Sequence, residues 1–185
     1  MSTSLKNHFL VAMPGMNDPS FEETVTLICE HTSEGAMGVI INRPTPLTLG
    51  DVLGELDLAA SSTAMAERQV VAGGPVSQDR GFVVHGQPGE FESTLEVSTD
   101  LRISFSLDVV NWLATLGQPE KILFGLGYAG WESGQLEQEI LSNAWLTTPS
   151  DTGIVFDVPF EARWKAAADL IGVDLARIAP GAGHD

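Results

Sequence analysis

TVTLICEHTSEGAMGVIIN, residues 24–42, contains two runs of β-branched and apolar residues separated by a turn. The first run, residues 24–31, alternates roughly, which predicts a strand with Val25, Leu27 and Cys29 on one face. Residues 32–35 have turn composition, and residues 36–42 form the second run. The pattern predicts a β-hairpin. Similar strand signals dominate the first two-thirds of the chain.

Outward from this hairpin, strands and helices are mixed. Strands are expected at residues 8–13, 70–72, 81–85, 94–97, 101–105, 121–126 and 154–156. Helices are expected at residues 48–56 with Thr48 as N-cap, from Ser106 to a C-cap at Gly117, from Ser133 to Ala144, and from Pro159 to Ile171. Residues 58–69 are small, polar and aperiodic, which predicts a loop. This order of elements indicates the α+β class.

Length and charge limit the number of domains and the classes of partner that this protein can have. A chain of 185 residues fits one domain. Nine Lys and Arg residues face 25 Asp and Glu, a formal net charge of −16, which argues against direct binding to nucleic acid. The sequence shows no apolar run near the ~20 residues of a membrane span and no signal-peptide pattern at its start. Its one cysteine, Cys29, agrees with a reducing compartment. We therefore expect a cytoplasmic protein without a membrane partner.

A glycine pattern at residues 125–130, GLGYAG, matches the dinucleotide fingerprint G-x-G-x-x-G. That fingerprint requires an acidic residue about 20 positions later on a second parallel strand. The residues at that distance, 149–151, fall in an expected loop, so the glycines predict a structural loop and no nucleotide cofactor.

Cys29-Glu30-His31 places a thiol and an imidazole two residues apart. In a regular strand Cys29 and His31 share a face, so a thiolate–imidazolium pair is sterically allowed. The alternative is that Cys29 is a small core residue and His31 the polar end of the strand. The four histidines lack the spacing of a zinc site, so no metal is expected.

A tight excursion between two strands is expected at Gly73-Gly74-Pro75 and Asp79-Arg80-Gly81. Its glycines permit close approach of the backbone to a ligand or partner. Arg80 could bind an anion there or pair with Asp79.

Several ordered segments together resemble the YqgE/AlgH family. The resemblance spans residues 8 to about 172. The segments that carry it are Phe9–Pro14, Cys29–His31, Gly35–Gly38, Asn42–Pro44, Gly73–Val76, Asp79–Phe82 with His85, Gly127–Ala129, Trp131-Glu132, Gly134–Ile140 and Asn143–Leu146.

The resemblance implies a bacterial cytoplasmic protein with a mixed, partly barrel-like sheet flanked by helices. It implies one domain, residues 1–185, with a core at about 8–172 and a flexible tail at 173–185. The family brings no established activity or cofactor, although it is sometimes labelled a transcriptional regulator. The candidate ligand-binding residues are Arg43, Gly73, Gly74, Arg80, His85 and Gly127.

We expect a non-enzymatic binding or regulatory protein that acts on an unidentified protein or small molecule. The alternatives are a thiol enzyme or redox sensor that uses Cys29 with His31, and a transcriptional regulator. An enzymatic role would require Cys29, His31, His85, Arg43 and Arg80 to converge on one cleft.

Overall fold

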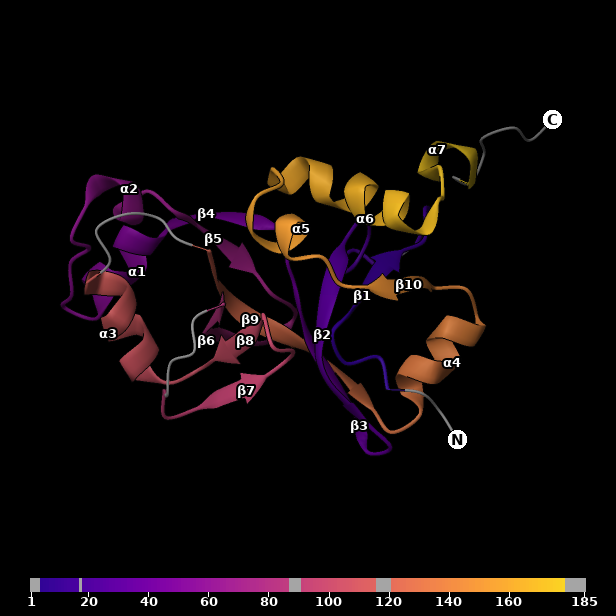
Figure 1. Ribbon diagram of the computed structural model, residues 1–185, viewed down its shortest axis with the longest axis horizontal. Helices are drawn as coiled ribbons and strands as arrows, with labels where there is room; N and C mark the ends of the chain where they lie inside the picture. The colour runs from indigo at the N-terminus through magenta and orange to yellow at the C-terminus, as the bar shows by residue number, and fades with distance from the viewer. Residues whose placement is uncertain (1–3, 17, 87–90, 116–120, 179–185) are drawn as a thin grey trace.

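A computed structural model describes residues 4–16, 18–86, 91–115 and 121–178. It is a curled, mixed sheet flanked by helices, which confirms the expected fold class (Figure 1). The strands are β1 His8–Ala12, β2 Val25–Thr32, β3 Gly35–Ile40, β4 Pro44–Thr48, β5 Gln69–Ala72, β6 Val76–His85, β7 Thr94–Glu96, β8 Arg102–Ser104, β9 Ile122–Glu132 and β10 Trp145–Pro149. The helices are α1 Leu49–Glu55, α2 Thr63–Ala66, α3 Leu107–Thr115, α4 Gln135–Leu141, α5 Thr152–Phe156, the 3-10 turn η1 Phe160–Ala162, α6 Arg163–Ile171 and α7 Leu175–Ile178.

Strand β9 joins the two halves of the sheet. Its second half pairs antiparallel with β3, and its first half pairs antiparallel with β6 and parallel with β5. The main strand order is β10-β1-β2-β3-β9-β6-β8-β7, with β4 attached through β5. Figure 1 shows β1–β3 and β10 on one side of β9 and β4–β8 with α1–α3 on the other. The single strand β9 therefore belongs to both hydrogen-bonded arrays.

The central part of the sheet is buried on both faces, which explains the nearly continuous apolar runs of β1 and β2. One face packs against α5 and α6 around Phe9, Leu27 and Val84. The opposite face packs at one end against α1–α3, around Val83 and Phe124, and at the other end against α4, around Leu10 and Trp131. We call these the first, second and third clusters. Adjacent residues of one strand, such as Val83 and Val84, enter different clusters because side chains alternate across a sheet.

Several local expectations are confirmed. The expected hairpin of β2 and β3 forms, with antiparallel pairing. Thr48 caps α1 through a capping box: its hydroxyl accepts from the Asp51 backbone N–H at 3.2 Å, and the Asp51 carboxylate accepts from the Thr48 N–H at 2.9 Å. The strand β1 and the helices α3, α4 and α6 also lie where the sequence placed them, although α4 ends before Ala144. The expected C-cap Gly117 lies outside the described residues.

Other expectations were wrong. Residues 58–69 contain α2, which Ser62 caps and whose Met65 is fully buried in the second cluster. Residues 154–156 are helical in α5 because Asp151 caps them, its carboxylate accepting from the Ile154 N–H at 3.2 Å. The strands β4 and β10 were missed. In the segment expected to be a tail, α7 forms and Leu175 packs against the first cluster. No helix in the described ranges is long and apolar enough to span a membrane.

The glycines at 125–130 do not form the expected loop but lie inside β9. One of them, Gly127, is needed where another backbone approaches closely. A Cβ on Gly127 would lie 2.6 Å from the Gly74 carbonyl oxygen, and one on Gly74 would lie 2.2 Å from the Tyr128 carbonyl. Gly127 also has a φ of 84°, in the left-handed region. Gly127 therefore marks the contact between β9 and the segment before β6, whereas a Cβ on Gly125 would meet the side chains of Phe82 and Val71.

We expect Gly127→Ala to destabilise the protein much more than Gly134→Ala. Both glycines have a positive φ, but a Cβ on Gly134 meets nothing within 4 Å. The left-handed strain of about 1–2 kcal/mol is thus common to both variants, and only Gly127→Ala adds a backbone clash. Urea denaturation should give an excess loss of at least about 2 kcal/mol for Gly127→Ala. Equal losses in the two variants would contradict this account of β9.

Candidate functional site

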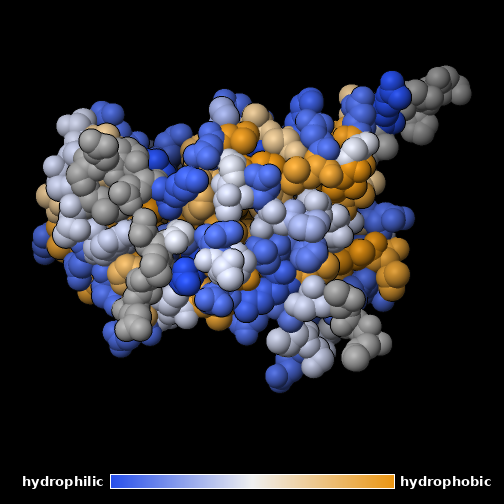
Figure 2. Space-filling model, in the orientation of Figure 1, coloured by the Kyte–Doolittle hydropathy of each residue, from blue (hydrophilic) through white to orange (hydrophobic). Residues whose placement is uncertain are grey.

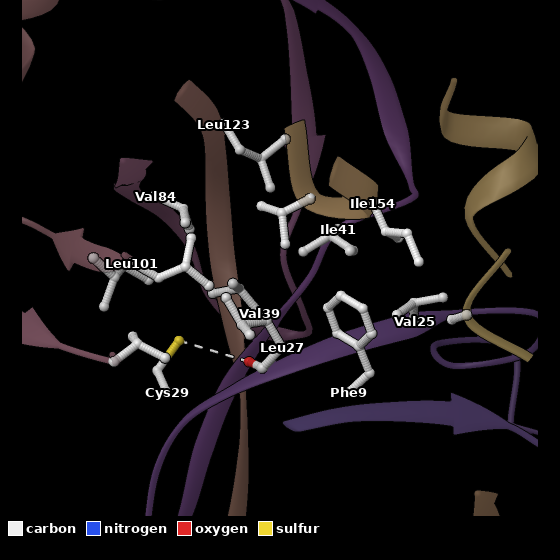
Figure 3. Packing of buried hydrophobic residues seen from close by; sticks show 14 of the residues in the cluster. Phe9, Val25, Leu27, Cys29, Val39, Ile41, Val84, Leu101, Leu123 and Ile154 are labelled. Carbon is white, nitrogen blue, oxygen red and sulfur yellow. Dashed lines mark hydrogen bonds between the residues drawn. The ribbon is translucent and has the colours of Figure 1, made fainter. Parts of the chain in front are cut away.

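Cys29 lies in the first cluster and is fully buried. Figure 3 shows its sulfur among side chains such as Val39 and Leu101, with Sγ donating weakly to the Leu27 carbonyl oxygen at 3.6 Å. Burial raises the pKa of the Cys29 thiol to about 12, and the nearby Glu30 carboxylate adds to the rise. A thiol in this state is neutral and inert at physiological pH.

His31 does not share a face with Cys29, so that expectation was wrong. The register of β2 against β3 shifts between Ile28 and Glu30, which marks a β-bulge. A bulge inserts one extra residue and so reverses the alternation of the side chains that follow. Cys29 consequently enters the first cluster, while the His31 ring contacts α4 on the opposite face of the sheet.

His31 is buried and held at both ring nitrogens. Its Nδ1 accepts from the Leu5 backbone N–H at 2.9 Å, and its Nε2 lies 2.9 Å from Oε2 of Glu137. Because Nδ1 accepts, Nε2 carries the hydrogen that is donated to Glu137. The backbone N–H of Glu137 and the His31 side chain both lower the pKa of that carboxyl group. The ring therefore fastens the N-terminal segment and α4 to the end of the hairpin.

Four candidate residues come together at the approach of β9 to the segment before β6. Gly73, Gly74 and Gly127 form that contact, and Arg43 and Gly74 line a small hollow of about 110 Å³. The Arg43 guanidinium donates to the carbonyl oxygens of Ser20 and, at 3.0 Å, of Glu22. Through these hydrogen bonds Arg43 holds the turn at residues 18–23. The hollow is too small for more than a few atoms.

Arg80 and His85 lie elsewhere. Arg80 falls within β6, because that strand begins at Val76 and the expected excursion is shorter than predicted. Its guanidinium lies 4.7 Å above the Phe105 ring, and no ion pair joins it to Asp79. His85 is fully buried and shares a hydrogen bond of 2.8 Å with Ser104 Oγ. Cys29, His31, His85, Arg43 and Arg80 thus occupy separate places and do not converge on one cleft.

A further candidate site is one that the sequence analysis missed. A groove of about 510 Å³ lies between α1, α3 and the adjoining parts of β6 and β9, and we call it the α1–α3 groove. Its floor includes Phe105, Phe124 and Leu126. The size falls in the usual range of ligand pockets, roughly 300–1,000 Å³.

Three exposed leucines lie on the rim of the α1–α3 groove. Leu47, Leu56 and Leu107 line it and are 41%, 44% and 59% exposed. They are three of the six large hydrophobic residues exposed in the described ranges. Leu56 follows the last residue of α1, and Leu107 is the first residue of α3. The sequence predicted both helices, but it could not show that the end of α1 lies beside the start of α3.

Comparison with known proteins gives the family. The AlgH-like family model matches residues 9–176. The chain belongs to the AlgH-like family. This confirms the resemblance drawn from the ordered segments.

Relatives match along nearly the whole chain. A UPF0301 protein of Thioalkalivibrio sulfidiphilus is 50% identical over 183 residues, which cover 99% of this chain and 98% of that protein. A UPF0301 protein of Saccharophagus degradans is 49% identical over 181 residues, covering 98% and 89%. The solution structure of the AlgH protein from Pseudomonas aeruginosa matches with a TM-score of 0.80 at 48% identity, covering 100% of this chain and 98% of that one. These matches agree on the family of this chain, and the names of the matched proteins state no activity.

We expect the Cys29 thiol to resist alkylation in the folded protein. With a pKa of about 12, its thiolate fraction at pH 8.5 is roughly a thousandfold below that of an ordinary thiol. Iodoacetamide labelling, followed by mass spectrometry, should be fast in urea and negligible without it. A native labelling rate that rises with a midpoint near the ordinary thiol value would contradict this.

The same burial predicts a loss of stability at high pH. The folded-state pKa of Cys29 is raised, so between its ordinary value of 9.0 and about 12 the unfolded chain releases a proton that the folded chain keeps. Stability from this group is therefore complete below pH 9 and declines as pH rises, by at most about 1.4 kcal/mol per unit. Urea denaturation at pH 8 and 10.5 should show a smaller decline for Cys29→Ala than for the wild type. Equal declines would contradict the shift.

Proposed function

We propose that this protein is a non-enzymatic binding protein that receives a cationic, amphipathic segment of a partner polypeptide in the α1–α3 groove. The observation that carries the proposal is the grouping of Leu47, Leu56 and Leu107 on one rim. Contiguous exposed apolar residues rimmed by polar ones are typical of contact surfaces, and their exposure is unfavourable unless a partner covers them.

Charge favours a cationic occupant. Asp51, Glu55 and Asp79 line the groove, and no lysine or arginine among the described residues does. None of the three carboxylates has an ion-pair partner in the described part of the chain. A segment with leucine-like side chains on one face and Lys or Arg beside them would cover the apolar rim and neutralise these carboxylates.

A second apolar surface is less suited to an external partner. Figure 2 shows hydrophobic residues gathered over α6, where Trp164 and Leu175 border a pocket of about 560 Å³. The charged residues around it are paired within the chain, Lys165 with Asp169 at 3.2 Å and Arg177 with Asp174 at 3.5 Å. The α1–α3 groove differs because its carboxylates form no ion pair within the described part of the chain.

The other hypotheses have less support. A thiol enzyme or sensor lacks its geometry, because the bulge in β2 puts Cys29 and His31 on opposite faces. Direct transcriptional control would require DNA to approach a chain of net charge −16. We also propose a cytoplasmic location, which fits the single buried cysteine without a disulfide.

The proposal predicts saturable binding of an amphipathic Leu/Lys helical peptide of about four turns. Fluorescence anisotropy of the labelled peptide measures it. Replacing Leu56 and Leu107 together by serine should weaken binding about tenfold or more, because apolar area is lost from the contact. The matched control is the double serine variant of Leu141 and Leu170, which are also exposed, by 77% and 45%, but lie on α4 and α6.

Charge is tested separately. Changing Glu55 and Asp79 to lysine should also weaken binding, whereas changing the exposed Glu30 and Glu161 to lysine alters net charge equally and should have little effect. A Leu/Glu peptide should not bind. Equal effects of the groove and control variants would refute the proposal in favour of non-specific attraction. Concentration-dependent dimerisation that the groove variants abolish would instead assign the groove to a second copy of this chain.

A further inference from the structure

Arg163, the first residue of α6, is 96% buried yet forms no ion pair with a carboxylate in the described part of the chain. Its Nε donates to the Val158 carbonyl oxygen at 2.8 Å, its Nη1 donates to that of Ile41 at 2.6 Å, and its guanidinium lies 4.5 Å above the Phe160 ring. In the described ranges, Thr26 Oγ1 is the only fully enclosed side-chain oxygen or nitrogen without a hydrogen-bond partner. The remaining nitrogen of Arg163, Nη2, therefore reaches accessible space.

That space is a pocket of about 280 Å³ where β5 and β9 begin and α6 starts. Arg68 lines it together with Arg163 and Phe160. Nη2 of Arg68 donates to the Ile122 carbonyl oxygen at 2.5 Å. No hydrogen-bond or ion-pair partner is found for its other guanidinium nitrogens in the described part of the chain. The pocket thus holds two guanidinium groups fixed by backbone carbonyls.

Leaving these two charges together is costly. Burial and, more weakly, the positive charge of Arg68 together lower the pKa of Arg163 to about 10, while Asp157 opposes this more weakly still. Burial also lowers the pKa of Arg68. Glu67 lines the pocket but forms no ion pair with either arginine. In a chain with 25 acidic residues, two neighbouring arginines without a counter-ion indicate a place for an external anion.

We propose that Arg68 and Arg163 form a binding site for a phosphate group, either inorganic phosphate or the phosphate of a small monoester. Two planar guanidinium groups match the several oxygens of a phosphate, and a doubly charged anion neutralises both. The start of α6 adds the positive end of a helix dipole. The small volume excludes burial of a whole nucleotide. This site is separate from the α1–α3 groove and does not depend on the proposal made for it.

The test is calorimetric titration of the full chain, at constant ionic strength, with inorganic phosphate, glycerol phosphate and acetate. We expect saturable binding of the phosphate compounds. Arg68→Gln should weaken it about tenfold or more, as expected for losing a charged hydrogen bond, and Arg68→Lys should have an intermediate effect. The matched control is Arg102→Gln, since Arg102 is also half-buried but pairs with Glu96 at 3.4 Å and lies on β8. Circular dichroism confirms that each variant is folded.

A monoester that binds more tightly than free phosphate would show that the pocket also recognises the attached group, and equal binding would assign the site to phosphate itself. The proposal is overturned if neither phosphate compound binds saturably, if Arg68→Gln and Arg102→Gln have equal effects, or if acetate competes as well as phosphate. Loss of peptide binding to the α1–α3 groove would leave these results unchanged.

Discussion

The close approach of β9 to the Gly73-Gly74 segment is the constraint on which the rest of the fold depends. β9 can serve both arrays of strands only if its backbone passes within contact distance of that segment, where any side chain would clash. Gly127 satisfies this with a positive φ, so the strand turns without breaking. Because β9 is continuous, α1–α3 on one side and α4 on the other pack against parts of the same strand. The α1–α3 groove and the arginine pocket both open beside its first half.

The sequence predicted those elements whose cause is local. The β2–β3 hairpin and the Thr48 cap of α1 follow from neighbouring residues, so no distant contact was needed to place them. The prediction of a strand at residues 154–156 was wrong because a short apolar run has no periodicity that distinguishes strand from helix. The deciding signal was the Asp151 cap before them. The prediction of a loop at the glycines of β9 was wrong for another reason. Glycine is compatible both with loops and with close backbone packing, and which of the two forms depends on the segment that faces it.

The candidate site was harder to predict because its members are brought together by tertiary contacts. Strand alternation predicted that Cys29 and His31 lie on one face, but a bulge of one residue places them on opposite faces. No sequence pattern indicates this bulge. Leu56 and Leu107 lie about fifty positions apart and meet only because α1 and α3 pack on the same face of the sheet. Arg68 and Arg163 are farther apart still. Composition described the total charge correctly, yet it could not show that two of nine cations share a pocket.

The two proposed sites are physically connected although their ligands differ in charge. Phe124 borders both the α1–α3 groove and the arginine pocket. The backbone carbonyl of Arg68 accepts the N–H of Leu49, the first residue of α1, at 2.7 Å. An anion that draws in the Arg68 guanidinium therefore acts on the residue that anchors α1, one wall of the groove. If this contact transmits any free energy, linkage requires the factor by which phosphate changes the affinity for the cationic segment to equal the factor by which the segment changes the affinity for phosphate.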